Sequence, residues 1–546
     1  MIRINQCKVS VPYTMQDVEK KVSQILHCKS EDIQKIHIVK ESLDARKKPA
    51  LFYSLVLDVA CRAEEKLLRN TKSKDVQPAP EKKYRFPVTA GHICSDRPVI
   101  IGAGPAGLVC AYYLAKAGLR PIILERGRSV EQRKADIDRF WETGVLDTTS
   151  NVQFGEGGAG TFSDGKLNTL IKDKYGRCRE VLSLFVKMGA PADILYKQKP
   201  HVGTDLLMGM VKNLRLAIIE LGGEVRFESK VTGLILCKQP EKVGIREGTQ
   251  AVKGVIVNDT EKIVSDHIVL AIGHSARDTF EMLAETTLTM QPKDFAVGYR
   301  VQHFQEQIDE SQYGKQDEAC REALGAASYK LTAQTKDGRG VYSFCMCPGG
   351  YVVNASSEKG RLAVNGMSYH DRGSGVANAA IIMTVTKEDF PDQSPLGGVA
   401  FQRELEERAF QLADGKIPVQ SLGDFKRHEE RLTEHNADVG DSPIRIKGQW
   451  AFANTRSILP EKLNEAFLEG MEQFGRKIKG FDADDTMIAG IESRTSSPVR
   501  IVRDEEGVSS LKGLYPCGEG AGYAGGITSA AMDGLLAAER IAVSMT

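Results

Sequence analysis

A strand, a glycine turn and a helix follow one another in residues 97–127, and this unit is what most constrains the fold. Three apolar residues at 99–101 lead into Gly102, Gly104 and Gly107, after which small residues open a helical segment. In such a unit the first glycine permits the tight turn, the second lets backbone approach a pyrophosphate, and the third lets helix and strand pack closely. Free N–H groups at the helix start favour a bound diphosphate. The sequence therefore predicts a dinucleotide site at this turn.

Two features near this turn bear on which nucleotide it holds. Glu125 ends the next strand, where its carboxylate can accept hydrogen bonds from the adenosine ribose hydroxyls. The same carboxylate would repel a 2′-phosphate, so we do not expect NADP here. The GxGxxG spacing recurs at 155–160 and 520–525, but only the copy at 102–107 lies between an apolar strand and a helix. The alternative is a glycine turn without a ligand in an α/β protein.

The composition excludes several classes of protein. Of the 546 residues, 41% are hydrophobic and 27% are charged, which is unlike disordered, collagen-like or integral membrane proteins. No apolar run reaches the length of a membrane span, and the first residues lack the apolar core of a secretory signal. The 11 cysteines form no CxxC pair, so we expect free thiols in a reducing, cytoplasmic setting and no metal site.

The pattern of apolar residues divides the chain into segments with different expected secondary structure. Residues 1–69 fit a small α+β unit of the order βαββ, and the polar segment 70–87 fits a linker. Residues 88–290 alternate strands and helices, and the glycine-rich style returns at 488–546. Between them, residues 291–487 combine antiparallel-looking strands with helices. Those helices are expected near 376–385, 399–413 and 460–478.

Glycine-rich segments far apart in the chain resemble one known group of proteins. The turn GAGPAG (102–107), the strand and turn within 265–278 and the C-terminal segment 513–539 resemble the FAD-binding domain of the NAD(P)/FAD-dependent oxidoreductase superfamily. A closer resemblance is carried by FGEGGAGTFSDGKL (154–167), FCMCPGGYVV (344–353), NGMS (365–368), GIESRTSSPVRI (490–501) and YPCGEGAGYAGG (515–526). Over nearly the whole chain, these segments resemble the poorly characterised family of bacterial FAD-dependent dehydrogenases with an N-terminal extension.

The resemblance implies an α/β fold with FAD as the cofactor. Residues 88–290 and 488–546 would form a Rossmann-like, three-layer FAD-binding domain. Residues 291–487 would form an inserted antiparallel-sheet α+β domain for the substrate. The small N-terminal βαββ domain at 1–69 would pack outside this body or cap the site.

The same resemblance assigns a set of residues to the cofactor. They lie in the glycine turns, at strand ends and at the start of the last helix: Gly102, Gly104, Pro105, Ala106, Gly107, Glu125, Arg126, Gly157, Gly158, Thr161, Ser163, Lys166, Val231, Ala271, Gly273, Gly518, Glu519, Gly525, Gly526 and Ile527. In the family's C-terminal motif the acid that faces the ribityl chain of the flavin is usually Asp. Here that position holds Glu519, whose side chain is one methylene longer. The helix after Gly526 would direct its N-terminus at the flavin N1 and C2 oxygen, where it stabilises negative charge on reduced flavin.

Two charged residues are candidates for catalysis beside the flavin. Lys166, in a loop rich in glycine, would place a positive charge near the flavin edge, unless the loop is a flexible surface segment. Arg494 lies among small polar residues and would suit an anion or a carbonyl group. The alternative for Arg494 is an ion pair with Glu492 or another acid.

Two further candidates are a thiol and a phenol. Cys345 and Cys347 are two residues apart on an expected strand, so both thiols would share one face. Cys347 would then exchange electrons with the flavin, or the pair would be buried structural thiols. Tyr523 would cover the ring, contact substrate or pack in the core.

The preferred function is that of an FAD-dependent dehydrogenase or reductase, which exchanges a hydride between flavin N5 and an organic substrate. No second strand–GxGxxG–helix unit occurs in 291–487, so NAD(P)H or an electron-carrier protein would be a transient electron partner. A flavin monooxygenase is the first alternative, and a structural role for FAD without catalysis is also open.

A tRNA-modifying flavoprotein is a third possibility, because the chain begins with a basic segment. Residues 1–90 contain 18 Lys and Arg against 11 Asp and Glu, a balance of +7, and Arg46 to Lys48 form a basic turn. The segment has no recognisable RNA-binding module and few aromatic residues for stacking, so a nucleic-acid partner is not expected. The segment would instead dock on the more acidic remainder.

Overall fold

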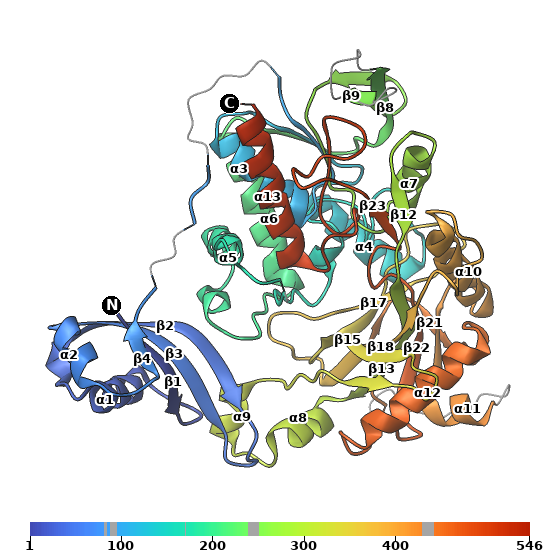
Figure 1. Cartoon of the computed structure of the whole chain (residues 1–546). Helices are drawn as coiled ribbons and strands as arrows, with labels where there is room; N and C mark the ends of the chain where they lie inside the picture. The colour runs from blue at the N-terminus through green and yellow to red at the C-terminus, as the bar shows by residue number, and fades with distance from the viewer. Residues whose placement is uncertain (81–83, 88–95, 170, 239–249, 429–441, 546) are drawn as a thin grey trace.

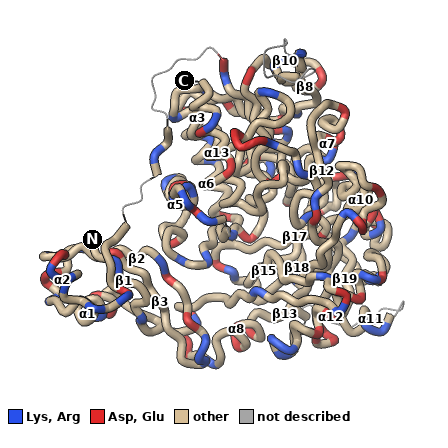
Figure 2. Tube along the Cα trace, in the orientation of Figure 1, with Lys and Arg blue, Asp and Glu red and all other residues tan. Residues whose placement is uncertain are grey.

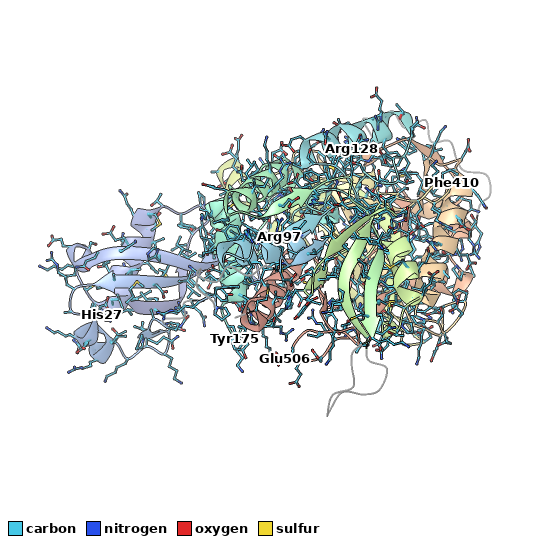
Figure 3. The ribbon with its side chains drawn as sticks, turned by 90° about the horizontal axis from the view of Figure 1, so that it is seen from above. His27, Arg97, Arg128, Tyr175, Phe410 and Glu506 are labelled. Atoms are coloured by element: carbon cyan, nitrogen blue, oxygen red, sulfur yellow. The ribbon has the colours of Figure 1, made fainter. Side chains whose placement is uncertain are left out.

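The computed structural model describes residues 1–80, 84–87, 96–169, 171–238, 250–428 and 442–545. Figure 1 shows a small N-terminal unit beside a larger body, and the last helix of the chain lies in the upper part of that body. In the view from above, the N-terminal unit, where His27 lies, projects to one side (Figure 3).

The N-terminal unit is an antiparallel sheet in the order β2-β3-β1-β4 with a helix packed on it. Its elements are β1 (Ile2–Val9), α1 (Met15–Leu26), β2 (Ile33–Asp44), β3 (Phe52–Cys61), α2 (Glu64–Asn70) and β4 (Val76–Pro78). Helix α1 begins after Thr14, whose side chain accepts a hydrogen bond from the Asp17 N–H while the Asp17 carboxylate accepts one from the Thr14 N–H. The buried face of α1 completes the core of this unit.

Strand β4 corrects the linker expected at 70–87. It pairs antiparallel with β1, with Ile2 opposite Pro78, so the sheet extends into that segment. A three-residue edge strand is too short to show an alternating apolar pattern, which is why the polar composition predicted a linker instead.

The centre of the body is a parallel sheet in the order β24-β11-β5-β6-β7, formed by strands that are far apart in the sequence. Its strands are β5 (Val99–Ile101), β6 (Ile122–Leu124), β7 (Glu224–Arg226), β11 (Ile268–Leu270) and β24 (Leu514–Pro516). Strands β5, β6, β11 and β24 are buried throughout, as the continuous apolar runs of a covered parallel sheet require.

Two different layers cover the faces of this sheet. Side chains alternate between the two faces along each strand. Ile100, Ile123 and Val269 point to one face and pack with helices, whereas the residues before and after each of them in the strand pack with a second, antiparallel sheet on the other face. The helices are α3 (Pro105–Lys116), α6 (Thr204–Glu220) and α13 (Ile527–Ser544), and the second sheet contains β8 (Val231–Lys238), β9 (Gln250–Val257) and β10 (Glu261–Val264). The predicted α/β, three-layer fold class is confirmed.

The inserted domain is built on a mostly antiparallel sheet in the order β14-β15-β18-β13-β22-β19-β21. Its strands are β13 (Phe295–Phe304), β14 (Thr332–Gln334), β15 (Gly340–Cys347), β18 (Val376–Val385), β19 (Ile417–Ser421), β21 (Trp450–Phe452) and β22 (Met487–Glu492). Helices α10 (Gly397–Leu412) and α12 (Glu461–Gly475) contact this sheet, and their apolar faces share its core.

Two expectations about this domain are wrong. Residues 376–385, expected as a helix, are strand β18 at the centre of the sheet between β13 and β15. Nine of its ten residues are buried, so the strand lacks polar alternation, and its alanines imitate a helical composition. The boundary expected at 487–488 falls at the start of β22, which pairs with β13 and therefore belongs to the inserted sheet.

The remaining elements connect these layers. They are α4 (Val130–Thr143), α5 (Arg177–Lys187), α7 (Arg277–Ala284), α8 (Gln305–Tyr313), α9 (Glu318–Leu324), α11 (Leu422–Arg427), the pair β12 (Met290–Pro292) and β23 (Val499–Ile501), and the sheet of β16 (Tyr351–Asn354), β17 (Val364–Met367) and β20 (Ile446–Lys447). Within the described ranges, no helix combines the length and apolar character that a membrane crossing needs.

The close crossing of α3 and α13 gives a first testable prediction. A Cβ atom at Gly534 would lie 2.1 Å from the Ala106 carbonyl oxygen, so Gly534→Ala forces the two helices apart. We expect this variant to lose about 1–3 kcal/mol of unfolding free energy, measured by chemical denaturation. Gly209→Ala on α6 is the matched control, because nothing lies within 4 Å of its added Cβ, and it should be neutral or slightly stabilising. Equal losses in both variants would contradict this packing.

Candidate functional site

A cavity of about 310 Å³ lies at the carboxyl ends of the parallel strands, where α/β sheets commonly hold ligands. Of the residues predicted to hold the cofactor, the cavity is lined by Gly102, Gly104, Pro105, Ala106, Glu125, Arg126, Gly158, Ser163, Lys166, Val231, Ala271, Gly273, Gly518, Glu519, Gly525, Gly526 and Ile527. Gly107, Gly157 and Thr161 do not line it. Gly157 and Thr161 border a small apolar cavity behind Pro105 instead.

The glycine turn after β5 has the geometry that its sequence predicts. Gly102 has a φ of +103°, and a Cβ there would lie 2.4 Å from the Ala271 carbonyl oxygen. A Cβ at Gly107 would lie 2.0 Å from the Gly102 carbonyl oxygen, so this glycine serves helix packing rather than the cavity wall. Helix α3 begins at Pro105 with Gly104 as its N-cap and no side chain capping it, which leaves its first N–H groups for an anion.

The Glu125 carboxylate joins this turn to the loop that carries Gly155. Its Oε2 accepts a hydrogen bond from the Ala103 N–H at 2.8 Å, and its Oε1 accepts from Gly127 at 2.9 Å and Gly155 at 3.0 Å. A carboxylate has room for about four such bonds, so one acceptor position on Oε2 stays open toward the cavity that Glu125 lines. The predicted ribose contact is compatible with that position and stays a prediction.

Three glycines keep space free on the far side of the cavity. Cβ atoms built at Gly273, Gly525 and Gly526 would meet no protein atom within 4 Å, although all three residues line the cavity. Gly526 is also the N-cap of α13 and provides no side chain to its first turn. The starts of α3 and α13, which no side chain caps, can bind an anionic diphosphate, and the three glycines leave room for a flat ring. Together they form a glycine cradle that suits a flavin dinucleotide.

Glu519 lies in the same cavity wall, near Lys293 and Cys345. Burial raises the pKa of Glu519 to about 7, although the Lys293 charge partly offsets the increase. This carboxyl therefore binds its proton more tightly than an ordinary glutamate does, and in its protonated form it can donate as well as accept a hydrogen bond.

Lys166 and Ser163 occupy the loop between the cofactor cavity and the inserted domain. The Lys166 Nζ lies 3.3 Å from Asp164 Oδ2 and has no hydrogen-bond partner. Burial alone would lower the pKa of Lys166, but the Asp164 carboxylate raises it above its ordinary value, so the ammonium stays charged. The Ser163 hydroxyl donates to the Gly160 carbonyl at 2.7 Å and shapes the loop.

The expected pairing of two thiols on one strand face is wrong. Strand β15 has an irregularity between Phe344 and Cys347, and Cys345 has a φ of +46°, which breaks the two-residue alternation. Cys345 consequently lines the cavity, whereas Cys347 is fully buried and lines neither this cavity nor the larger one next to it. The thiol candidate at the cavity is Cys345 rather than Cys347.

The two thiols affect each other's protonation. The Cys347 thiol donates to the Cys345 carbonyl oxygen at 3.2 Å. Hydrogen bonding from Cys347 lowers the pKa of the Cys345 thiol, and the Lys166 and Arg300 charges lower it further. Burial raises the pKa of Cys347. Of the two thiols, Cys345 is therefore the one whose surroundings favour the thiolate.

Arg494 lines the cavity but is held from behind by an acid. Its guanidinium contacts Glu406 through Nε at 2.9 Å and Nη2 at 2.8 Å, and Arg277 shares the same carboxylate. The predicted alternative of an ion pair therefore applies, with Glu406 rather than Glu492 as the partner. The Arg494 carbonyl accepts a 2.8 Å hydrogen bond from His274, and burial lowers the pKa of that imidazole to about 4, so it stays neutral.

Tyr523 lies outside the cofactor cavity. Its ring packs against the guanidinium of Arg503 at 3.8 Å and that of Arg500 at 4.8 Å, and its hydroxyl accepts from the Arg503 N–H. It lines a second, larger cavity of about 1100 Å³. The half-buried ring also packs against the hydrophobic core between the parallel sheet and strands β8 and β9, so the predicted core packing is present and the contact with substrate stays a prediction.

The second cavity lies directly beside the first. Both are lined by Lys166, Asn168, Phe344, Cys345 and Gly525, which form a shared wall between them. The N-terminal unit contributes to the wall of the second cavity through residues of β2 and β3. Those residues are Glu41, Leu43, Ala45 and Tyr53, where Ala45 follows β2.

Sequence reasoning missed Arg300, the residue that holds the shared wall in shape. Its fully buried guanidinium donates to the Cys345 carbonyl at 2.9 Å and pairs with Glu492 at 2.8 Å. A Cβ at Gly366 would lie 2.2 Å from the Arg300 Nη1, and Asn365 accepts from Nη2 at 2.9 Å. The NGMS segment at 365–368 therefore packs closely against this arginine, and that motif was the available signal.

Comparison with known proteins identifies the family. The family profile described as FAD-dependent protein, C-terminal domain-like matches residues 294–495, an NAD(P)-binding Rossmann-like domain matches 100–131, and a domain of unknown function (DUF8436) matches 1–60. An uncharacterized protein of Clostridium beijerinckii is 46% identical over 544 residues, which are 99% of this chain and 98% of the relative. The chain belongs to this FAD-dependent protein family. FAD is accordingly its cofactor, and the chain is a member of the FAD-dependent oxidoreductase superfamily.

Two solved structures show a remote similarity to the chain. Quinol fumarate reductase FrdA of E. coli is 12% identical, with 82% of this chain and 70% of that chain covered and a TM-score of 0.37. Glycerol-3-phosphate dehydrogenase of Bacillus halodurans complexed with FAD is 12% identical, with 82% and 64% covered and a TM-score of 0.34. At TM-scores this low, the similarity says nothing about the activity of this chain.

The glycine cradle predicts a variant that folds but loses the cofactor. Gly525→Val adds a side chain whose Cβ would meet no protein atom within 4 Å, so the fold should be unaffected while the space for FAD is filled. We expect at least a tenfold weaker FAD affinity, measured by titrating the FAD-free protein with FAD, and an unchanged melting temperature of the FAD-free form. Unchanged FAD affinity would contradict the cradle.

The β15 irregularity predicts selective labelling of one thiol. With iodoacetamide at pH 6.5, Cys345 should be alkylated at least tenfold faster than the buried Cys110 and Cys347, because only thiolate reacts. Peptide mass spectrometry gives the rates. Cys347→Ala removes the donor and should slow the labelling of Cys345. Equal rates at Cys345 and Cys110 would disprove the assignment of the thiolate.

Proposed function

We propose that the protein is an FAD-dependent dehydrogenase or reductase whose organic substrate occupies the 1100 Å³ cavity. One observation carries the proposal: this cavity and the cofactor cavity share a wall that contains Lys166 and Cys345. A hydride passes only between groups in contact, so a substrate space must adjoin the cofactor space. FAD supplies hydride exchange at its N5 atom when bound.

The residues of the shared wall have defined tasks in this reaction. Lys166 remains an ammonium because Asp164 stays ionised beside it, and it can stabilise negative charge on a substrate oxygen. Burial by itself would raise the pKa of Asp164, but the Lys166, His201 and Arg372 charges bring it below its ordinary value. Glu519, with its pKa near 7, can hold or release a proton on the cofactor side of the wall.

The electron partner is either a transient NAD(P)H or an electron-carrier protein. In the described part of the inserted domain the chain forms a mostly antiparallel sheet, and this architecture does not supply the strand–turn–helix unit that holds a dinucleotide permanently. The large second cavity could receive a nicotinamide in turn with the substrate.

A nucleic-acid partner receives no support from the basic turn of the N-terminal unit. Arg46 pairs with Asp44 at 2.7 Å, and the Lys48 ammonium donates to the Ser311 carbonyl of the body. Figure 2 shows acidic as well as basic stretches along this unit. The turn therefore serves docking between the unit and the body.

Flavin reduction in two Lys166 variants tests the proposal. The purified protein should be yellow, and anaerobic mixing with NADH, NADPH or a reduced ferredoxin should bleach the flavin in stopped-flow measurements. Lys166→Met should keep its FAD but slow the bleaching by at least tenfold, because it removes the positive charge that we expect near the flavin edge, where it stabilises negative charge on the reduced ring. Lys166→Arg, which keeps the charge, should retain most of the rate. A protein without FAD would defeat the proposal. Incorporation of oxygen from air into a product would favour a monooxygenase.

A further inference from the structure

One buried carboxylate, which lines the cofactor cavity next to the wall shared with the second cavity, is surrounded by more positive charge than it can balance. Asp164 is 1% exposed, and its Oδ2 lies 3.3 Å from Lys166 Nζ, 3.6 Å from His201 Nδ1 and 3.8 Å from Arg372 Nη2. Its Oδ1 is occupied by the Ser368 hydroxyl at 2.7 Å. Lys166 and Arg372 alone carry two positive charges against one negative charge.

Hydrogen bonding in this group is incomplete. Lys166 Nζ, His201 Nδ1, Arg372 Nε and Asp164 Oδ2 are all buried and without a hydrogen-bond partner. The His201 side chain is 9% exposed, and its Nε2 donates to the Tyr369 carbonyl, so Nδ1 carries a proton only when the ring is charged. Buried polar atoms without partners are costly, which indicates that a ligand completes the set.

Lys199 adds a further cation beside this group. Its ammonium donates to the Ser328 hydroxyl at 2.9 Å, and no carboxylate is within ion-pair distance of it among the described residues. Although Lys199 is an exposed residue, partial desolvation of its ammonium lowers its pKa, and the charges of Arg372 and Lys166 lower it further. A bound anion would relieve the repulsion between these like charges.

These cations face the second cavity, and its acids are mostly engaged elsewhere. Lys166, Lys199, His201, His370 and Arg372 line the cavity, where the rings of His201 and His370 stack 5.8 Å apart with an interplanar angle of 1°. Of the acids that line the same cavity, Asp193 pairs with Lys197, Glu41 accepts from the Tyr13 hydroxyl, Asp371 accepts from the Gly373 N–H, and Glu322 is exposed.

We propose that Lys166, Lys199 and Arg372 form a subsite for an anionic oxygen group, so that the substrate of this enzyme is an organic anion. The shared chemistry is that of a carboxylate or a phosphate, both of which suit a guanidinium flanked by ammonium groups. The inference deepens the proposed function and rests on it, because the subsite contains Lys166 of the wall shared with the cofactor cavity. The subsite would hold the anionic group of the substrate next to the part of the substrate that exchanges the hydride.

Anion binding to the oxidised holoenzyme tests the subsite. Sodium succinate and sodium phosphate are titrated separately at constant ionic strength, with sodium chloride as the reference, and binding is followed by calorimetry and by the flavin absorbance. We expect saturable binding of one or both anions, and the anion that binds identifies the group. Arg372→Met and Lys199→Met should each weaken that binding at least tenfold with full FAD content.

A matched variant and the FAD content separate the possible failures. Lys262→Met removes an exposed lysine on β10 and should bind the anion as the unaltered protein does. If neither anion binds beyond chloride to a protein that holds its FAD, or if Arg372→Met and Lys199→Met bind normally, the subsite is overturned and the oxidoreductase proposal is not. If the unaltered protein holds no FAD, the proposed function itself fails.

Discussion

Three stretches of backbone are held together by the carboxylate of Glu125. It accepts N–H donors from the turn after β5, from the residue after Arg126 and from the glycine loop at Gly155. Buried N–H groups need acceptors, and an ionised acceptor makes stronger bonds than a carbonyl does. With these stretches joined, a Cβ at Gly158 would lie 3.2 Å from Gly104, so the start of α3 and the loop form one continuous floor for FAD.

A second buried charge plays the corresponding part in the inserted domain. Arg300 joins β13 to β15 through the Cys345 carbonyl and to β22 through Glu492. An arginine in a sheet core is tolerated only when its donors are satisfied, and Asn365 and Asn378 accept the remaining ones at 2.9 Å each. The position of Cys345 in the wall between the two cavities therefore depends on a side chain outside both of them.

Features that depend on neighbouring residues in the chain could be predicted, and features that depend on distant partners could not. The turn at Gly102 follows from local backbone requirements, and family resemblance pointed to most of the residues that line the cofactor cavity, although Gly107, Gly157 and Thr161 do not line it. Strand β18 was missed because burial on both faces removes the alternation that marks a strand. Cys347 was misplaced because the irregularity in β15 depends on contacts with Arg300 and β18 rather than on local sequence.

The second cavity could not be predicted from any single segment of the sequence. Lys199, His201 and Arg372 come from loops that have no common motif, and the cavity is completed by residues of β2 and β3. Backbone hydrogen bonds between Glu41 and the stretch 196–198 attach the N-terminal unit there, at 2.8 Å and 2.9 Å. Such a meeting of segments is a property of the tertiary structure.

The position of β24 and α13 determines when the cofactor can enter the growing protein. Strand β24 pairs with β11, and α13 crosses α3, so the last part of the chain supplies an edge of the parallel sheet and one side of the FAD cradle. During synthesis on the ribosome, the earlier strands must wait with an exposed edge and an open glycine turn until these residues emerge. The complete cradle for FAD therefore forms only after β24 and α13 have joined the earlier strands and α3.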